Sequence, residues 1–101
     1  MEITYSYNKN ELTVFLNGEL DHHTAKMTRD AIDDIISMKP VNTLIINMDK
    51  LTFMDSSGIG LVLGRYKLLS EMGGKVELSV KNSAIRRIFE MSGVNKLIRF
   101  K

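Results

Sequence analysis

Hydrophobic and polar residues alternate at the start of the chain, which is the pattern of strands exposed on one side. Ile3, Tyr5 and Tyr7 are separated by polar residues and predict a half-exposed first strand. A second apolar run, 12–16, follows the polar turn 8–11. The two runs are therefore expected to pair as a hairpin.

After the hairpin, predicted helices and strands alternate along the chain. The first helix is expected to end before Pro40, because proline cannot continue a helix. The other two are expected to end at glycines, which readily adopt the left-handed turn after a helix. The predicted helices run to about Met38, from about Asp55 to Glu71, and from Asn82 or Ser83 to Gly93, and the predicted strands cover 43–48, 75–80 and 96–100.

This order predicts an α/β fold with a mixed sheet of roughly four to five strands, mostly parallel in its strand–helix–strand units. The run 43–48 is apolar on both faces, so it is expected to be a central strand. The stretch 51–64, which joins it to the second helix, then lies at the carboxyl end of a middle strand. Binding sites of open α/β sheets usually form there.

Polar side chains gather at this strand–helix junction. Asp55, Ser56 and Ser57 are residue types that accept hydrogen bonds from the unpaired N–H groups of a helix's first turn. A negative charge is also well tolerated at this end of a helix. Three interpretations stay open from the residues alone: a helix cap, an anion site, or a serine placed to receive a phosphate.

The helix after this junction has apolar residues on two sides. Leu61, Leu68 and Met72 fall on a different side from the main apolar face, so the helix is either wedged between helical neighbours or partly exposed for a partner. Gly60 and Gly64 lie between the two sides, and each lowers helix stability by ~1 kcal/mol relative to alanine. The predicted main face consists of Ile59, Val62, Leu63, Tyr66 and Leu69.

Length and composition favour one cytoplasmic domain. The 101 residues suit a single domain spanning 1–101. Cysteine is absent, the N-terminus lacks the pattern of a signal peptide, and no apolar run approaches the ~18 residues of a membrane helix.

The charges are unevenly divided between the two halves of the chain. Residues 1–50 hold 5 basic and 8 acidic side chains, whereas 51–101 hold 9 and 4. The basic half could favour an acidic partner. Nucleic acid is a poor candidate, because the basic residues are spread out and no aromatic residues are interleaved with them.

The patterns argue against catalysis and against a bound metal or cofactor. A serine hydrolase would place the nucleophile in G-x-S-x-G, but Met54 stands where the first glycine belongs. His22 and His23 have no third ligand at metal-binding spacing. The glycines at 58, 60 and 64 fit the dinucleotide fingerprint only loosely, since the third comes one position late. We therefore predict no enzyme activity and no cofactor.

Four separated motifs together resemble the anti-sigma-factor antagonists of the STAS family, most closely those that act in sporulation. They are Gly-Glu-Leu-Asp-His-His-Thr at 18–24, Leu-Thr-Phe-Met-Asp-Ser-Ser-Gly-Ile-Gly at 51–60, Leu-Gly-Arg-Tyr-Lys at 63–67 and Met-Ser-Gly at 91–93. The resemblance spans about 12–100 and implies a mixed sheet with helices packed largely on one face. Family members usually continue with a short helix after the last strand, and this sequence ends at Lys101.

The resemblance also implies a function. An unmodified antagonist of this kind binds an anti-sigma factor that is also a serine kinase, and this frees the sigma factor. The kinase then phosphorylates the serine after the motif aspartate, here Ser56, which abolishes binding until a serine phosphatase resets the protein. An interaction module of a general stress-response switch is the alternative. The partner-binding residues implied are Asp21, Asp55, Ser56, Ser57, Gly58 and Gly60.

Overall fold

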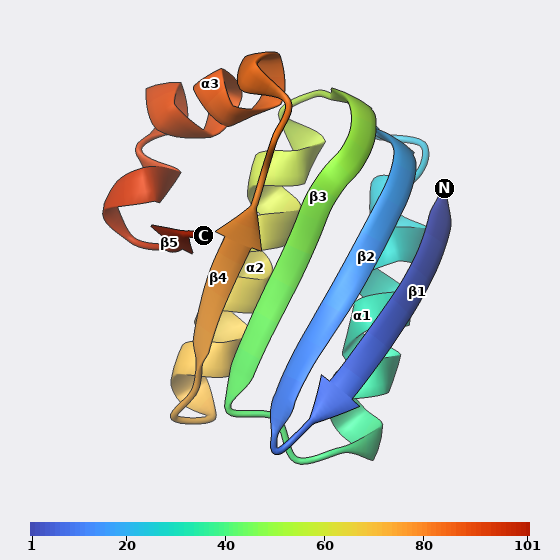
Figure 1. The fold of residues 1–101 in the computed structure, drawn as a ribbon, viewed down its shortest axis with the longest axis vertical. Coiled ribbons are helices and arrows are strands. Elements are labelled where there is room, and N and C mark those ends of the chain that lie inside the picture. The colour runs from blue at the N-terminus through green and yellow to red at the C-terminus, as the bar shows by residue number, and fades with distance from the viewer.

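A five-stranded mixed sheet forms the centre of the computed structural model, which describes residues 1–101 (Figure 1). The strands lie in the sheet in chain order; the first pair is antiparallel and every later pair is parallel. This confirms the predicted α/β class. The strands are β1 (Glu2–Asn8), β2 (Glu11–Leu20), β3 (Thr43–Met54), β4 (Lys75–Ser79) and β5 (Arg99–Phe100).

The helices leave one face of the sheet open. In Figure 1, α1 (Ala25–Met38) and α2 (Ser57–Glu71) lie behind the sheet, and α3 (Ser83–Ser92) lies beyond the upper end of β4. A short 3-10 turn, η1 (Val94–Lys96), connects α3 to β5. The expectation that helices pack largely on one face is therefore met.

The core lies between the sheet and these helices. Strand register brings Val14, Ile46 and Leu78 side by side, and all three are fully buried. The residues one position further along each strand point to the open face, because successive side chains alternate. They include Phe15, which is 40% exposed, and Asn47. The apolar pattern of the strands thus fixes which face the helices cover.

Two strands are longer than the sequence pattern predicts. β3 continues through 49–54, which was expected to be a connecting stretch, and β2 continues to Leu20 alongside it. Leu51 and Met54 remain buried in this extension. The pairing shifts register after Phe15 and again after Gly18. Such irregularities break the strict alternation that predicts a strand.

The last strand is shorter than predicted. Only Arg99 and Phe100 pair with β4, whereas 94–96 forms the 3-10 turn. Ile98 is buried and Leu97 is 56% exposed, so the apolar pair that suggested a strand is divided between core and solvent.

The α2 helix turns a different face toward the core than its spacing predicts. Ile59, Leu63 and Tyr66 are only partly buried, while Leu61 belongs to the core and Met72 is exposed. The helix packs against β3, β4 and α1 at once, so its inner face also takes in a charged residue. The buried residues of α2 are Gly58, Leu61, Val62, Arg65 and Leu69.

The cap of α3 follows the sequence prediction. The Asn82 side chain accepts hydrogen bonds from the N–H groups of Ala84 (2.9 Å) and Ile85 (3.1 Å). Asn82→Ala is expected to lower the free energy of unfolding by about 1 kcal/mol, because these two donors lose their partner. Urea unfolding followed by circular dichroism measures this. Asn82→Asp, which keeps the acceptor, should stay near wild type, and equal losses in both variants would contradict the capping role.

Candidate functional site

The loops that follow β2 and β3 meet at one edge of the sheet. Because the two strands are parallel neighbours, their carboxyl ends bring the segment 21–24 next to Asp55 and Ser56. The Asp55 N–H donates to the carbonyl of Leu20 (3.2 Å). The His22 N–H donates to Oδ2 of Asp55 (3.3 Å). The structure thus joins the two loops that the sequence motifs singled out separately.

Asp55, rather than either serine, supplies the side-chain cap of α2. Its Oδ1 accepts from the Ser57 N–H at 2.8 Å, and its backbone carbonyl accepts from the Gly58 N–H at 3.0 Å. The Ser57 N–H bond, helped by the His22 N–H and opposed by partial burial, lowers the pKa of Asp55. Asp55 is therefore ionised and held in place at neutral pH.

Asp21 fixes the neighbouring loop. Its Oδ1 accepts from the N–H groups of His23 (2.9 Å) and Thr24 (3.1 Å). Desolvation raises the pKa of Asp21, but these two donors together with the His23 and Thr24 side chains outweigh it, and the net pKa is lowered. The Thr24 hydroxyl also donates to the carbonyl of Glu19 (2.9 Å). Two ionised carboxylates thus stand at the same edge of the sheet.

The lowered pKa of Asp55 predicts a pH dependence of stability. The folded state favours the carboxylate, so this stabilisation is present above the unfolded-state pKa and is lost as the pH falls through the folded-state pKa. Asp55→Asn should be less stable than wild type at neutral pH and lose less stability on acidification. Urea midpoints at neutral pH and at about pH 3 measure this. The wild-type pH dependence in Asp55→Asn would contradict the assignment.

The two serines differ in exposure. Ser56 is exposed and its hydroxyl has no hydrogen-bond partner within the chain, whereas Ser57 is half-buried. The N–H groups of Ile59 (3.1 Å) and Gly60 (3.4 Å) both donate to the backbone carbonyl of Ser56. The N–H groups of 57–60 are therefore all bonded inside the chain. Of the three interpretations of this junction, a ready-made anion site is the one this geometry disfavours.

The first two glycines of α2, Gly58 and Gly60, have different surroundings. Gly58 is buried, and a Cβ there would overlap the Met54 side chain and approach Leu20. Internal packing therefore accounts for glycine at position 58. At Gly60 such a Cβ would have no atom from another part of the chain within 4 Å.

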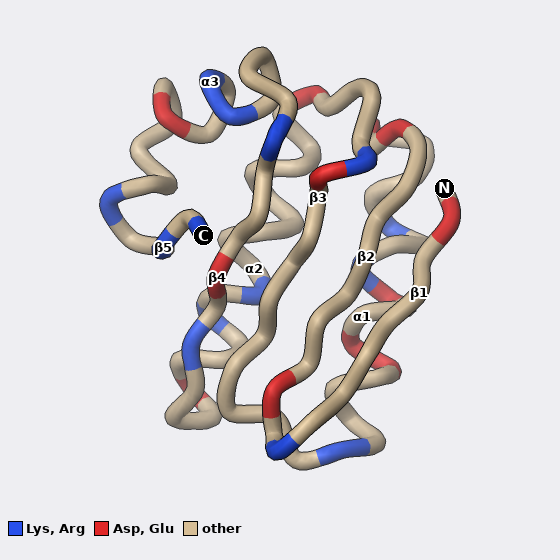
Figure 2. The backbone as a smooth tube through the Cα atoms, viewed as in Figure 1, with Lys and Arg blue, Asp and Glu red and all other residues tan.

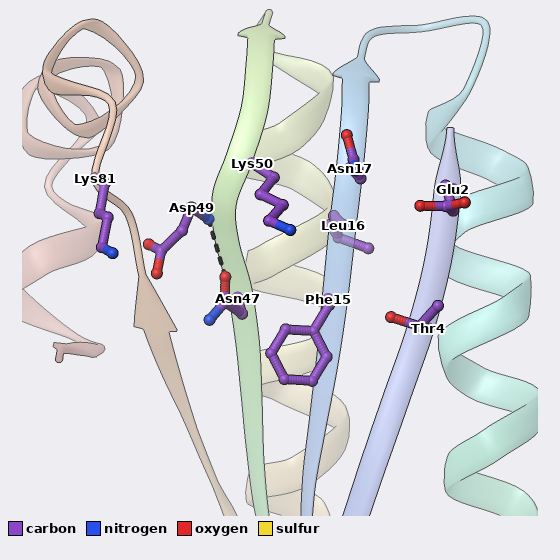
Figure 3. A pocket seen from close by; sticks show the side chains of 9 residues that line it. All are labelled: Glu2, Thr4, Phe15, Leu16, Asn17, Asn47, Asp49, Lys50 and Lys81. Atoms are coloured by element: carbon purple, nitrogen blue, oxygen red, sulfur yellow. Dashed lines mark hydrogen bonds between the residues drawn. The ribbon is translucent and has the colours of Figure 1, made fainter.

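A separate hollow lies on the open face of the sheet (Figure 3). Phe15 forms part of it, with Lys50 and Lys81 beside Asp49. The Asp49 carboxylate accepts from the Ser79 hydroxyl at 2.9 and 3.0 Å. The charged pair Asp49 and Lys50 lies within β3, and Lys81 follows the end of β4 (Figure 2). Sequence reasoning missed this hollow, because the register shift hides which of its residues share a face.

The structure contains no group of three or more His, Cys, Asp or Glu side chains arranged to hold a metal ion. None of its helices has the length and apolar character needed to cross a membrane.

Comparison with known proteins agrees with the fold and the motifs. The STAS domain profile matches residues 2–101. An anti-sigma F factor antagonist of Paenibacillus polymyxa is 38% identical over 98 residues, which cover 97% of this chain and 84% of the relative. An anti-sigma-B factor antagonist of Listeria monocytogenes is 28% identical over 90 residues, covering 89% and 78%.

Two solved structures of SpoIIAA share this fold. The unphosphorylated anti-sigma factor antagonist is 34% identical, with a TM-score of 0.84 and coverage of 99% of this chain and 88% of that one. The phosphorylated Bacillus protein is also 34% identical, with a TM-score of 0.76 and coverage of 99% and 91%. The chain therefore belongs to the STAS family. Its resemblance is to anti-sigma factor antagonists of the SpoIIAA kind, which are regulatory binding proteins and not enzymes.

Proposed function

We propose that this chain is a phosphorylation-controlled anti-sigma factor antagonist of sporulation. Its unmodified form binds an anti-sigma factor that is also a serine kinase, and the sigma factor is released. Phosphorylation of Ser56 ends the binding, and a serine phosphatase restores it. The observation that carries the proposal is the exposed, unbonded Ser56 hydroxyl at the junction of two carboxylate-bearing loops.

Accessibility favours Ser56 over Ser57 as the phosphoacceptor. A kinase must bring the hydroxyl oxygen in line with the γ-phosphate of ATP, which needs an exposed side chain. Ser56 is exposed, and the hydrogen bonds of Asp55 hold the backbone on either side of it. Ser57 is half-buried and its N–H is bound to Asp55. Asp55 thus has a positioning role in this proposal.

Charge explains how the modification would break the complex. A phosphate adds about −1.5 to −2 charges, directly beside the ionised Asp55 and near Asp21. The N–H groups of 57–60 are already bonded and offer it no compensation. Inside an interface this charge must be desolvated next to like charges, which is costly. The fold itself is expected to stay the same, because Ser56 is exposed and its hydroxyl makes no hydrogen bond within the chain.

The proposed partner surface surrounds Ser56. Asp21 and Ser57 flank it, and Gly60 leaves open space on the exposed side of α2. Gly58 supports this surface from below through its packing against Met54. The partners are the anti-sigma factor kinase and the phosphatase, and the setting is the cytoplasm, where sigma factors act.

An interaction module of a stress-response switch is the second candidate. Sequence identity favours the sporulation antagonist, since this chain is 38% identical to the anti-sigma F factor antagonist and 28% identical to the anti-sigma-B factor antagonist. Calorimetric titration of the unmodified chain with each type of anti-sigma factor separates them. We expect tight binding to the F-type factor, with displacement of its sigma factor. Binding to the B-type factor alone would support the second candidate, and binding to neither would overturn both.

A further inference from the structure

A groove runs between α1 and α2 and begins beside the phosphoacceptor candidates. His22 and Ser57 line one end, next to Ser56, and the groove continues along both helices. We call it the α1–α2 groove. Its lining residues are His22, Ala25, Lys26, Arg29, Ser57, Gly60, Leu61, Gly64 and Arg65.

The α1–α2 groove is lined by basic side chains. Lys26, Arg29 and Arg65 all contribute to it, and no acidic residue does. Asp30 contacts Lys26 (3.1 Å) and Arg29 (3.3 Å) from the same helix. These are surface pairs, which are weak and exchange readily with other ions. The groove therefore suits a negatively charged occupant.

Arg65 lies at the base of this groove with unused hydrogen-bonding capacity. Its side chain is only 9% exposed, and its Nε lies 3.0 Å from Oδ1 of Asp33. The N–H is not aligned for a hydrogen bond, so the buried Nε and Nη1 of Arg65 and Oδ1 of Asp33 have no hydrogen-bond partner. Buried donors without a partner are rare and unfavourable. A guanidinium satisfies its donors best with a carboxylate, through two parallel hydrogen bonds.

Two glycines keep the wall of the groove flat. Gly60 and Gly64 are four residues apart, so they lie on one face of α2. A Cβ at either position would have no atom from another part of the chain within 4 Å. Glycine destabilises a helix interior relative to alanine, and nothing inside the chain requires it at these two positions, in contrast to Gly58. The space they leave permits close approach of another backbone.

We propose that the α1–α2 groove binds an acidic helix of the anti-sigma factor, with a carboxylate on Arg65 and its backbone against Gly60 and Gly64. The inference rests on the proposed function and adds the chemistry of the partner segment. A helix fits better than a strand, because the N–H and C=O groups of α1 and α2 are bonded within their own helices and cannot pair with a strand. On binding, the Arg65 guanidinium turns away from Asp33, so that its Nε and Nη1, which are buried in the unbound chain, reach the partner carboxylate.

This placement also connects the groove to the switch. Ser57 and His22 line the end of the groove, so a phosphate on the adjacent Ser56 would stand beside the bound acidic helix. Like charges brought together at an interface repel. One segment of the partner would thus bind the basic groove and be repelled when Ser56 is phosphorylated.

Filling the flat wall tests the backbone contact. Gly60→Leu and Gly64→Leu place a side chain in the groove and should weaken binding to the purified F-type anti-sigma factor by about a hundredfold. The double variant Gly60→Ala/Gly64→Ala should raise the melting temperature, because alanine favours helix, and still weaken binding by about tenfold. Lower affinity in a more stable protein cannot come from misfolding. Ser70→Leu, at an exposed α2 position outside the groove, is the control.

Reversing charge tests the electrostatic contact. Lys26→Glu/Arg29→Glu should weaken binding by about a hundredfold and reduce its salt dependence. Arg87→Glu/Lys96→Glu makes the same change in net charge at exposed positions outside the groove and should bind almost as wild type. Arg65→Met, which keeps the volume and removes the donors, should weaken binding by about tenfold or more.

Calorimetric titration of these variants gives distinct outcomes. If the wild-type protein binds and the glycine and groove-charge variants bind equally tightly, the proposed role of the α1–α2 groove is overturned. The proposed function would then still stand. Equal weakening by the control pair Arg87→Glu/Lys96→Glu would also overturn it, since attraction would then be unspecific. No binding by the wild-type chain would overturn the proposed function and the groove together.

Discussion

Phosphorylation of Ser56 is expected to weaken binding to the anti-sigma factor several-hundred-fold or more. This corresponds to a loss of about 3–4 kcal/mol of binding free energy. The cause is a phosphate placed beside the ionised Asp55, where the nearby N–H groups are already bonded. Titration of the phosphorylated and unmodified proteins against the same partner measures the difference directly.

Two controls keep this expectation specific. Ser56→Ala removes an exposed hydroxyl that makes no hydrogen bond within the chain, so its free energy of unfolding should stay within about 0.5 kcal/mol of wild type and its binding should be retained. Circular dichroism spectra of the phosphorylated protein should match those of the unmodified protein. Its backbone amide NMR spectra should match away from residue 56. An unchanged affinity after phosphorylation, or a rearranged α2, would contradict the steric and electrostatic switch.

The largest expected effect on stability is at Phe89. Its side chain is fully buried, and its ring meets that of Phe100 edge to face with centroids 6.0 Å apart. Phe89→Ala is expected to lower the free energy of unfolding by about 3–5 kcal/mol, because it leaves a cavity between α3 and the sheet. That is a large part of the total stability of a small domain, about 5–15 kcal/mol.

Urea unfolding of Phe89→Ala measures this loss. Met91→Ala, two residues along the same helix at a side chain that is 79% exposed, should change stability by about 0.5 kcal/mol or less. A comparable loss in both variants would contradict the assignment of the loss to the buried Phe89 ring, because alanine favours helix and neither substitution can lower stability through helix propensity. A loss below about 1 kcal/mol in Phe89→Ala would show that α3 contributes little to the core.

The order of elements was predictable because local signals agree with the fold. The alternation around Tyr5, the stop at Pro40 and the cap at Asn82 each act within a few residues. The extension of β3 was not predictable, because it depends on a shifted register with β2 that breaks the alternation. The face of α2 was missed for a related reason: a charged residue, Arg65, occupies an inner position that periodicity assigns to apolar side chains.

The candidate site was predictable in part. The motifs at 18–24 and 51–60 are far apart in sequence, and only the parallel pairing of β2 with β3 brings Asp21 and Asp55 to one edge. Residue chemistry alone did not distinguish Ser56 from Ser57, since the two hydroxyls are equivalent. Their exposure, which depends on tertiary packing, separates them. The α1–α2 groove could not be predicted from the sequence, because it forms between two helices whose relative placement no local pattern specifies.

The most direct test of this account is the site of phosphorylation. The chain is incubated with ATP and the F-type anti-sigma factor kinase, and intact mass is followed by peptide mapping. We predict one phosphate, on Ser56, absent from Ser56→Ala and retained in Ser57→Ala. Phosphate on Ser57 would contradict the site, and no phosphate together with no binding to the kinase would contradict the switch itself.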